Sequence, residues 1–297
     1  MTKVIFYEVS TLGQFDLIYK DIVTDIMANG IWDKDQKVRA KWADGTPAYT
    51  KSVISKQIVL DNAEVPILTT KRVAWKTAIH ELIWFYIKRT SDVSYLRENN
   101  VKIWEEWTRE DGTIGRAYGY QLGKSFPEDG SPDGKRQSDR ITNQVEKLID
   151  GLKNNPASRR HIISLYNIDD NHDMALYPCV WHNQWLVKAN KLHLIVGIRS
   201  NDVGLGHPFN VFQYYVLQRM IAQVTGYELG TLTFNINDCH IYERHLEPLA
   251  KQIELEPFEA PTLWINPEVK NFDDFTIEDF KLLDYKHHEK VPMEVAI

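Results

Sequence analysis

The chain has 297 residues, 43% of them hydrophobic and nine of them tryptophan, which is enough for a sizeable core in one large domain or two small ones. Its net charge of −6 disfavours non-specific binding to DNA, RNA or an acidic membrane, but leaves room for a local cationic pocket that binds a small phosphate. There are only two cysteines, no run approaches the roughly 18 apolar residues of a membrane span, and the first residues lack a signal-peptide pattern, so we expect a soluble, cytoplasmic protein.

Hydrophobic periodicity assigns most of the first 90 residues. Apolar side chains three and four residues apart predict helices, and alternation of apolar and polar side chains predicts a strand. In chain order the sequence predicts a helix over 12–29, a polar loop over 32–50, a strand over 51–60 and a helix over 75–88. Arg39 lies in the polar loop, where a lone arginine is ordinarily solvated.

Glu81 lies in the middle of the second helix among residues that are apolar on most faces. Such a glutamate lies either on the one wet face of the helix or partly inside the core. Burial would raise the pKa of its carboxyl group, which suits a group that transfers protons. An ordinary surface glutamate is the alternative, and the pattern alone favours it.

Aromatic residues gather after the second helix. Trp104 and Trp107 are three residues apart and would share a helix face. They either belong to the core, which is the commoner role of tryptophan, or wall a pocket for a flat heterocycle. Tyr118 follows in a tight segment between Gly115 and Gly119. Residues 124–138 are the most linker-like stretch, and we interpret them as a surface excursion inside one domain.

The second half of the chain alternates strands and helices. It predicts a helix over 141–152, a strand over 162–166, two strands over 183–200 joined at Asn190-Lys191, a helix over 209–225, a strand from 234 to 242, a helix over 244–254 and strand-like pieces over 262–266 and 281–285. The last residues, 291–297, are apolar to the end. Because chain ends are usually polar and frayed, we expect this tail to dock against the body of the protein.

Arg159 and Arg160 are adjacent at the start of the predicted strand over 162–166. Paired arginines at the mouth of a strand suit bidentate binding of a phosphate or carboxylate. Salt bridges to acidic neighbours are the alternative, and the commoner one.

Cys179 is a candidate nucleophile, but only as a thiolate. It would need a cationic neighbour, and Arg199 supplies one if the strands 183–189 and 192–199 pair as a hairpin beside it. A buried, inert cysteine is the alternative, and nothing raises Cys239 above it. The spacing of cysteines and histidines predicts no metal site, and phosphate-binding glycine loops are absent.

Asn210 follows a glycine turn and Pro-Phe. A uracil edge presents an N–H donor at N3 and an acceptor at O4, and one asparagine amide offers the matching acceptor and donor. Cytosine reverses that edge, which an aspartate would serve better. Asn210 could equally cap a helix that begins at residue 211, and both interpretations stay open on this residue alone.

Together these segments resemble the thymidylate synthase family over nearly the whole chain, from the helix at residue 15 to Ile297. The motifs that carry the resemblance, in order, are His80-Glu81-Leu82-Ile83-Trp84, Asn99-Asn100-Val101 with Ile103-Trp104 and Trp107, Ser158-Arg159-Arg160, Met174-Ala175-Leu176 with Pro178-Cys179, Arg199-Ser200 with Asp202, Gly206 with Pro208-Phe209-Asn210, Asp238 with His240-Ile241-Tyr242, and Val295-Ala296-Ile297. As an ordered set they are highly specific, since chance agreement of all of them is negligible.

The resemblance implies an α+β fold: a single catalytic domain over 1–297 with a large mixed, mostly antiparallel sheet, flanked by helices and dimerising through the sheet face. It implies reductive methylation of dUMP to dTMP, with 5,10-methylenetetrahydrofolate as donor of the one-carbon unit and of the hydride and dihydrofolate as product. No metal is expected, and neither DNA nor a membrane is an expected partner.

The resemblance also implies roles for individual residues. The catalytic residues would be Cys179, which attacks C6 of dUMP, Glu81 and Tyr118, which manage proton transfers, Arg199 and Asn210. The dUMP-binding residues would be Arg39, Arg199 and Ser200 on the phosphate, Arg159 and Arg160 reaching in from the second subunit of a homodimer, Asn210 on the uracil edge, and His240 and Tyr242 on the ribose hydroxyl. The folate-binding residues would be Ile103, Trp104, Trp107, Leu176, Asp202, Gly206, Phe209, Ile297 and, near the glutamate tail, Lys71.

The sequence departs from most of the family around the cysteine. Val180 stands where most members have histidine, as in a smaller branch of the family. The loop over 40–46, directly after Arg39, also differs from the usual pattern. Tyr177, Trp181 and Gly204 are unusual, and no effect is assigned to them.

Two alternatives remain at this point. A dUMP hydroxymethylase of the same fold would add water instead of hydride to the exocyclic methylene; Trp104 and the apolar tail favour hydride transfer. A catalytically silent nucleotide- or RNA-binding relative would need neither Cys179 nor Glu81, and both are present.

Overall fold

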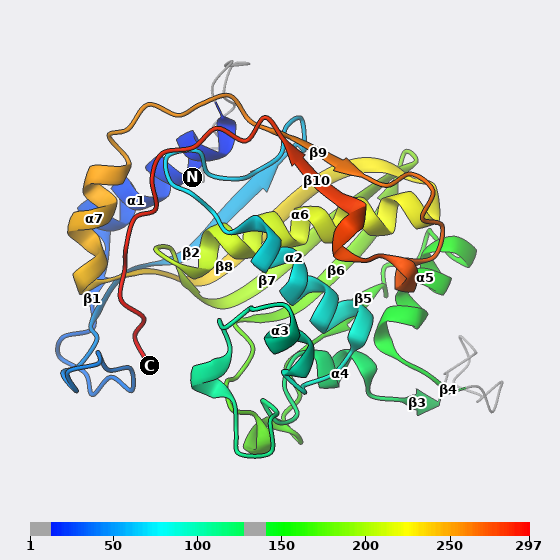
Figure 1. Ribbon diagram of the computed structural model, residues 1–297, viewed down its shortest axis with the longest axis horizontal. Helices are drawn as coiled ribbons and strands as arrows, with labels where there is room; N and C mark the ends of the chain where they lie inside the picture. The colour runs from blue at the N-terminus through cyan, green and yellow to red at the C-terminus, as the bar shows by residue number, and fades with distance from the viewer. Residues whose placement is uncertain (1–12, 128–140) are drawn as a thin grey trace.

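The computed structural model describes residues 13–127 and 141–297. Its centre is a six-stranded sheet in the order β1-β2-β8-β7-β6-β5 (Figure 1). The strands are β1 (Ile31–Trp32), β2 (Thr50–Leu60), β5 (Ile162–Ser164), β6 (Val180–Lys188), β7 (Lys191–Asp202) and β8 (Glu228–Tyr242). Only β7 and β8 run parallel, and the other neighbours are antiparallel. The predicted α+β fold with a mixed, mostly antiparallel sheet is confirmed.

Two small two-stranded sheets lie outside the main sheet. One pairs β9 (Thr262–Ile265) with β10 (Phe280–Leu283), which are the strand-like pieces expected near the C-terminus. The other pairs β3 (Phe126–Pro127) with β4 (Ile141–Thr142). The predicted surface excursion over 124–138 lies mostly outside the described residues, as does the first residue of the predicted helix over 12–29.

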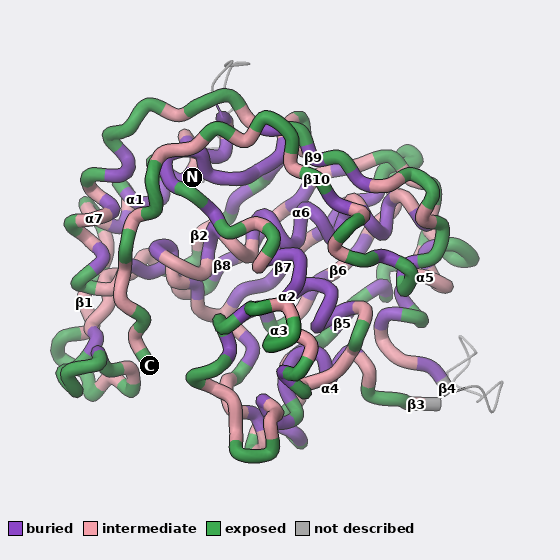
Figure 2. The backbone as a smooth tube through the Cα atoms, in the orientation of Figure 1, coloured by how far each residue is buried: buried purple, intermediate pink, exposed green. Residues whose placement is uncertain are grey.

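Helices cover the sheet in layers. They are α1 (Gln14–Asn29), α2 (Trp75–Ile83), α3 (Ser94–Glu98), α4 (Gly119–Gly123), α5 (Gln144–Asn154), α6 (Gly206–Thr225) and α7 (Leu246–Gln252). α6 packs on β7 and β8, and α2 packs on α6 in turn. Because α6 is enclosed on both sides, most of its side chains are buried, and buried segments concentrate in α6 and the middle of the sheet (Figure 2). Within the described chain, no helix is long and apolar enough to cross a membrane.

The structure corrects three local expectations. The predicted helix over 75–88 is α only to Ile83, and its last turn, Trp84–Lys88, is a π-helix. Trp104 and Trp107 do not share a regular α-helical face. Trp104 precedes a 3₁₀ turn over Glu105–Trp107 and Trp107 ends it, and their rings meet edge to face at 5.7 Å. α6 begins at Gly206, so Asn210 lies inside its first turns and does not cap a helix starting at 211.

The predicted hairpin of β6 and β7 forms, with its tight turn one residue earlier than expected. Ala189 and Asn190 both have positive φ angles, 49° and 59°. Two successive left-handed residues match the right-handed twist of the flanking strands, which is why this turn type closes antiparallel hairpins. The hairpin places Arg199, near the end of β7, beside Cys179, just before β6.

Candidate active site

A cavity of about 540 Å³ lies among α2, α6, the segment over 101–107, the hairpin of β6 and β7, and the C-terminal tail. Most of the residues predicted from the sequence line it: Arg39, Glu81, Ile103, Trp104, Trp107, Tyr118, Leu176, Cys179, Arg199, Ser200, Asp202, Gly206, Phe209, Asn210, His240, Tyr242 and Ile297. Three predicted residues, Lys71, Arg159 and Arg160, are not in its lining. Segments far apart in the sequence thus build one site.

Cys179 is held by backbone contacts on two sides. Its carbonyl accepts a hydrogen bond from the Arg199 backbone N–H at 2.9 Å, and its own N–H donates to the Tyr118 hydroxyl at 3.1 Å. The Arg199 guanidinium donates to the carbonyls of Pro178 and Tyr177, both at 2.9 Å. Burial raises the pKa of the Cys179 thiol, and the Arg199 charge opposes that rise. Arg199 therefore both orders the loop of the cysteine and favours its thiolate.

Tyr118 is fixed in a strained position next to the cysteine. Its backbone has φ 43° and ψ −100°, a conformation that non-glycine residues seldom adopt. Its ring stacks on Phe85 with centroids 4.6 Å apart and meets Trp104 edge to face at 5.2 Å. Burial raises the pKa of the phenol well above its ordinary value, so the hydroxyl stays protonated and available as a donor.

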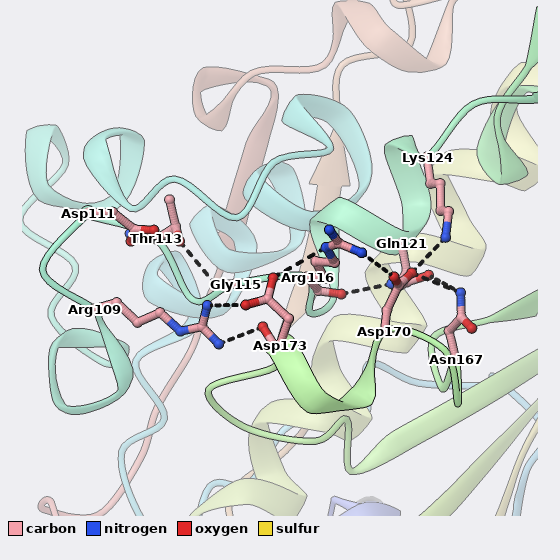
Figure 3. Close-up of polar contacts among 10 residues, drawn as sticks. All are labelled: Arg109, Asp111, Thr113, Gly115, Arg116, Gln121, Lys124, Asn167, Asp170 and Asp173. Carbon is pink, nitrogen blue, oxygen red and sulfur yellow. Dashed lines mark hydrogen bonds and ion pairs between the residues drawn. The ribbon is translucent and has the colours of Figure 1, made fainter.

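A polar network fixes the segment that carries Tyr118 to the segment that leads to Cys179 (Figure 3). Asp170, with a side chain only 3% exposed, accepts from Arg116, Lys124 and Gln121 at 2.7–2.9 Å. These donors, Gln121 first, hold the pKa of Asp170 well below its usual range. Asp173 binds Arg109 at 2.7 Å in the same region. These hydrogen bonds and ion pairs therefore fix the segment that carries Tyr118 relative to the segment that leads to Cys179.

Glu81 is buried, as the sequence allowed, with 9% of its surface exposed. One carboxylate oxygen accepts from the indole N–H of Trp104 at 2.5 Å, and the other accepts a short hydrogen bond from the Gln213 amide. Burial raises the pKa of the carboxyl, and the two hydrogen bonds oppose this. Glu81 therefore lies inside the core, and the ordinary surface glutamate is excluded.

Gln213 was missed from the sequence. It lies on α6, three residues after Asn210, and lines the cavity. Residues three apart on a helix share a face, so a glutamine at that spacing in an otherwise apolar stretch was the available signal. Asn210 itself accepts from the side-chain amide of the buried Asn201 at 3.5 Å, a long contact. Nearby on β8, His240 and Tyr242 point to the same side of the strand, and His240 contacts Asp238 at 3.1 Å.

The other end of the cavity is cationic and open. Arg39 is exposed, and Arg199 and Ser200 are partly exposed. Among the described residues, neither arginine forms an ion pair with a carboxylate. Uncompensated guanidinium groups beside a hydroxyl are suited to a phosphate.

The C-terminal tail docks at the cavity, as predicted, and ends beside the loop between β1 and β2 (Figure 1). Lys41 and Ile297 exchange two backbone hydrogen bonds, of 2.7 and 2.9 Å. Glu294 accepts from the Ala43 N–H at 3.0 Å and pairs with Arg244 at 2.8 Å. The divergent loop over 40–46 is therefore a docking site for the tail.

Of the three predicted residues that do not line the cavity, one is buried and two are exposed. Lys71 is 7% exposed, and its ammonium donates to the Gly204 carbonyl at 2.6 Å beneath the turn before α6. Burial lowers the pKa of Lys71 to about 8. This ammonium does not line the cavity, and its place near the glutamate tail of the folate stays a prediction. Arg159 and Arg160 are exposed before β5 and do not reach the cavity of their own chain.

Comparison with known proteins agrees with this geometry. The sequence model of the thymidylate synthase family matches residues 17–297. Thymidylate synthase 1 of Bacillus spizizenii and thymidylate synthase of Bacillus phage phi3T are each 59% identical to the chain, over 96% of it and 100% of their own length. The solved structure of thermostable thymidylate synthase A from Bacillus subtilis superposes with a TM-score of 0.87 at 59% identity, covering 95% of this chain and 99% of that one. The chain belongs to the thymidylate synthase family.

Proposed function

We propose that this cavity performs the family's reaction, the reductive methylation of dUMP to dTMP, with Cys179 as nucleophile. The observation that carries the proposal is the meeting of Cys179, Glu81 and Asn210 in one cavity, although they come from separate parts of the chain. A nucleophile, a buried proton-transfer group and an amide that matches the uracil edge are the groups that this chemistry needs.

In the proposed reaction the Cys179 thiolate forms a bond to C6 of dUMP, which makes C5 nucleophilic. C5 bonds to the methylene that 5,10-methylenetetrahydrofolate supplies, as the bond from that methylene to one folate nitrogen opens. The C5 proton then leaves through Glu81 and ordered water, and the bond to the second folate nitrogen breaks, which frees tetrahydrofolate and leaves an exocyclic methylene on the ring. The folate also supplies the hydride that completes the methyl group, becoming dihydrofolate, while the bond between sulfur and C6 breaks and the thiolate returns. The Tyr118 hydroxyl accepts from the backbone N–H of Cys179, which leaves its own hydrogen available for the proton transfers.

Different parts of the cavity lining suit dUMP and the folate. Asn210 binds the uracil edge, His240 and Tyr242 bind the ribose hydroxyl, and Arg39, Arg199 and Ser200 bind the phosphate. The flat, apolar surfaces that suit the folate ring come from Ile103, Trp104, Trp107, Leu176 and Phe209, with Asp202 and Gly206 beside them and Ile297 over the opening. The docked tail excludes water from the reacting carbon, which favours hydride over water as the final addition.

We infer further that the chain acts as one catalytic domain, in the cytoplasm, and as a homodimer in which Arg159 and Arg160 complete the partner's phosphate site. Both arginines are exposed and have no role in their own cavity. Strands of the sheet also expose apolar side chains, Ile54, Val59, Ile162 and Trp181, which supports pairing through the sheet.

The product assay tests the reaction. The protein is incubated with dUMP and 5,10-methylenetetrahydrofolate, dihydrofolate is followed by its absorbance, and the nucleotide is identified by mass. We expect dTMP and dihydrofolate in equal amounts. Hydroxymethyl-dUMP without dihydrofolate would mean that water, not hydride, adds to the methylene.

A further inference from the structure

Gln213 occupies an unusual position for a glutamine: it is 5% exposed, lies on the central helix α6 and borders the cavity. Its amide nitrogen donates to the Ala78 carbonyl at 2.9 Å and to Glu81 Oε2 through the short contact described above. A flipped amide would point its oxygen at that carbonyl and at that carboxylate, two acceptors. The orientation of the Gln213 amide is therefore fixed by its surroundings.

Each carboxylate oxygen of Glu81 consequently accepts a hydrogen bond from a nitrogen that can donate but cannot accept. The indole N–H of Trp104 faces Oε1, and the Gln213 amide nitrogen faces Oε2. When the carboxylate takes up a proton, that proton cannot lie between an oxygen and either nitrogen, because both positions already hold a hydrogen. It must take one of the remaining lone pairs, and Glu81 borders the cavity.

We propose that Gln213 is a positioning residue for the reaction, which holds the Glu81 carboxyl so that the proton it carries is directed toward the cavity and the bound nucleotide. The inference rests on the proposed function, in which Glu81 transfers protons. Gln213 itself does not touch the reacting carbon. It sets which lone pairs of Glu81 are free.

Several titratable or charged groups face this region from neighbouring elements. They are Tyr86 of the π-helical turn, Lys102 and Glu106 of the segment over 101–107, Tyr118 before α4, Cys179 before β6, Arg199 of β7 and Tyr214 of α6. Within the described chain none of the cations pairs with Glu81, and its hydrogen-bond partners are the neutral Trp104 and Gln213. Loss of the Gln213 donor should therefore raise the pKa of Glu81 further, since burial would be less opposed.

The test compares Gln213→Met with Gln218→Met. Methionine keeps the length of glutamine and removes its donors. Gln218 is a matched control, because it is fully buried on the same helix, donates to the Leu192 carbonyl at 2.8 Å, and lies outside the cavity. For each variant we would measure Tm, KM for dUMP, and kcat as a function of pH.

We expect Gln213→Met to lower kcat about 10- to 100-fold, the range of a misdirected proton-transfer group, with KM for dUMP changed less than about 3-fold. The limb of the kcat–pH profile that Glu81 controls should move to higher pH, because the pKa of Glu81 rises. The direction is the same whether the slow step needs Glu81 protonated or ionised. Gln218→Met should lower Tm and leave that limb in place. An unmoved limb in Gln213→Met, or an equal movement in Gln218→Met, would overturn the proposal.

A second variant and a second readout keep the test decisive. If Gln213→Met does not fold, Gln213→Glu keeps the size and places a second acid beside Glu81, which should move the limb in the same direction. Infrared spectra of carboxyl-labelled protein, with Glu81→Gln subtracted, would report the protonation of Glu81 without any turnover. A wild-type protein that forms no dTMP would count against the proposed reaction, whereas a Glu81 titration that is the same with and without Gln213 would count only against this inference.

Discussion

The two ends of the cavity are built differently. At the reacting end, Glu81, Trp104 and Tyr118 are buried, and hydrogen bonds or ring contacts fix each of them within one chain. At the phosphate end, Arg39 is exposed and Arg199 is partly exposed, and neither has a carboxylate partner among the described residues.

The difference separates two tasks. Proton transfer and bond formation need groups held in place before the substrate arrives, which burial and satisfied hydrogen bonds provide. Phosphate binding needs charge that is still free to pair, which exposed arginines provide and a second subunit can increase. Changes at the reacting end should therefore act on kcat, and changes at the phosphate end on the binding of dUMP.

The largest effect should follow the loss of the nucleophile. Cys179→Ala removes the sulfur that bonds to C6, so turnover should fall at least about 10³-fold while dUMP still binds. Cys239→Ala is the control: that thiol is buried in β8, outside the cavity, and burial raises its pKa to about 12. Calorimetric titration with dUMP and steady-state rates would separate binding from turnover. Retained turnover in Cys179→Ala would remove the cysteine from its role.

A smaller effect, on specificity, should follow Asn210→Asp. A carboxylate can accept from the amino group of cytosine but cannot donate to O4 of uracil. The affinity for dCMP relative to that for dUMP should therefore rise by about 100-fold. The phosphate end is untouched, and the affinity for inorganic phosphate should stay the same. Competition of dUMP and dCMP for the purified variant would measure the shift, and an unchanged preference would mean that Asn210 does not read the base.

The parts of this molecule that the sequence predicted are those that depend on local pattern. Apolar periodicity placed α1, β2, α2 and the hairpin of β6 and β7. The same pattern allowed a buried Glu81 but favoured a surface position, and the structure decided for burial. The pairing of the two strands places Arg199 beside Cys179, as expected for a hairpin at this position. The ordered motifs supplied most of the predicted residues that line the cavity.

What the sequence could not predict depends on contacts between distant residues. Gln213 meets Glu81 across 132 positions, and Arg116 meets Asp170 across 54. No periodicity encodes such pairs. The contact of the Lys71 ammonium with the Gly204 carbonyl was not predicted for the same reason, since the two residues are 133 positions apart. The early start of α6 was missed because glycine and proline in its first turn normally indicate a loop.

The most direct test of the two-ended site mixes two defective chains. Cys179→Ala and the double variant Arg159→Ala, Arg160→Ala are co-expressed and assayed at dUMP well below KM, where each alone should be nearly inactive. In the proposed homodimer, random pairing makes half of the dimers mixed. Each mixed dimer then has one site with an intact Cys179 and intact arginines from its partner, so we expect about a quarter of wild-type activity. Activity no greater than the sum of the two variants alone would contradict a site shared between subunits.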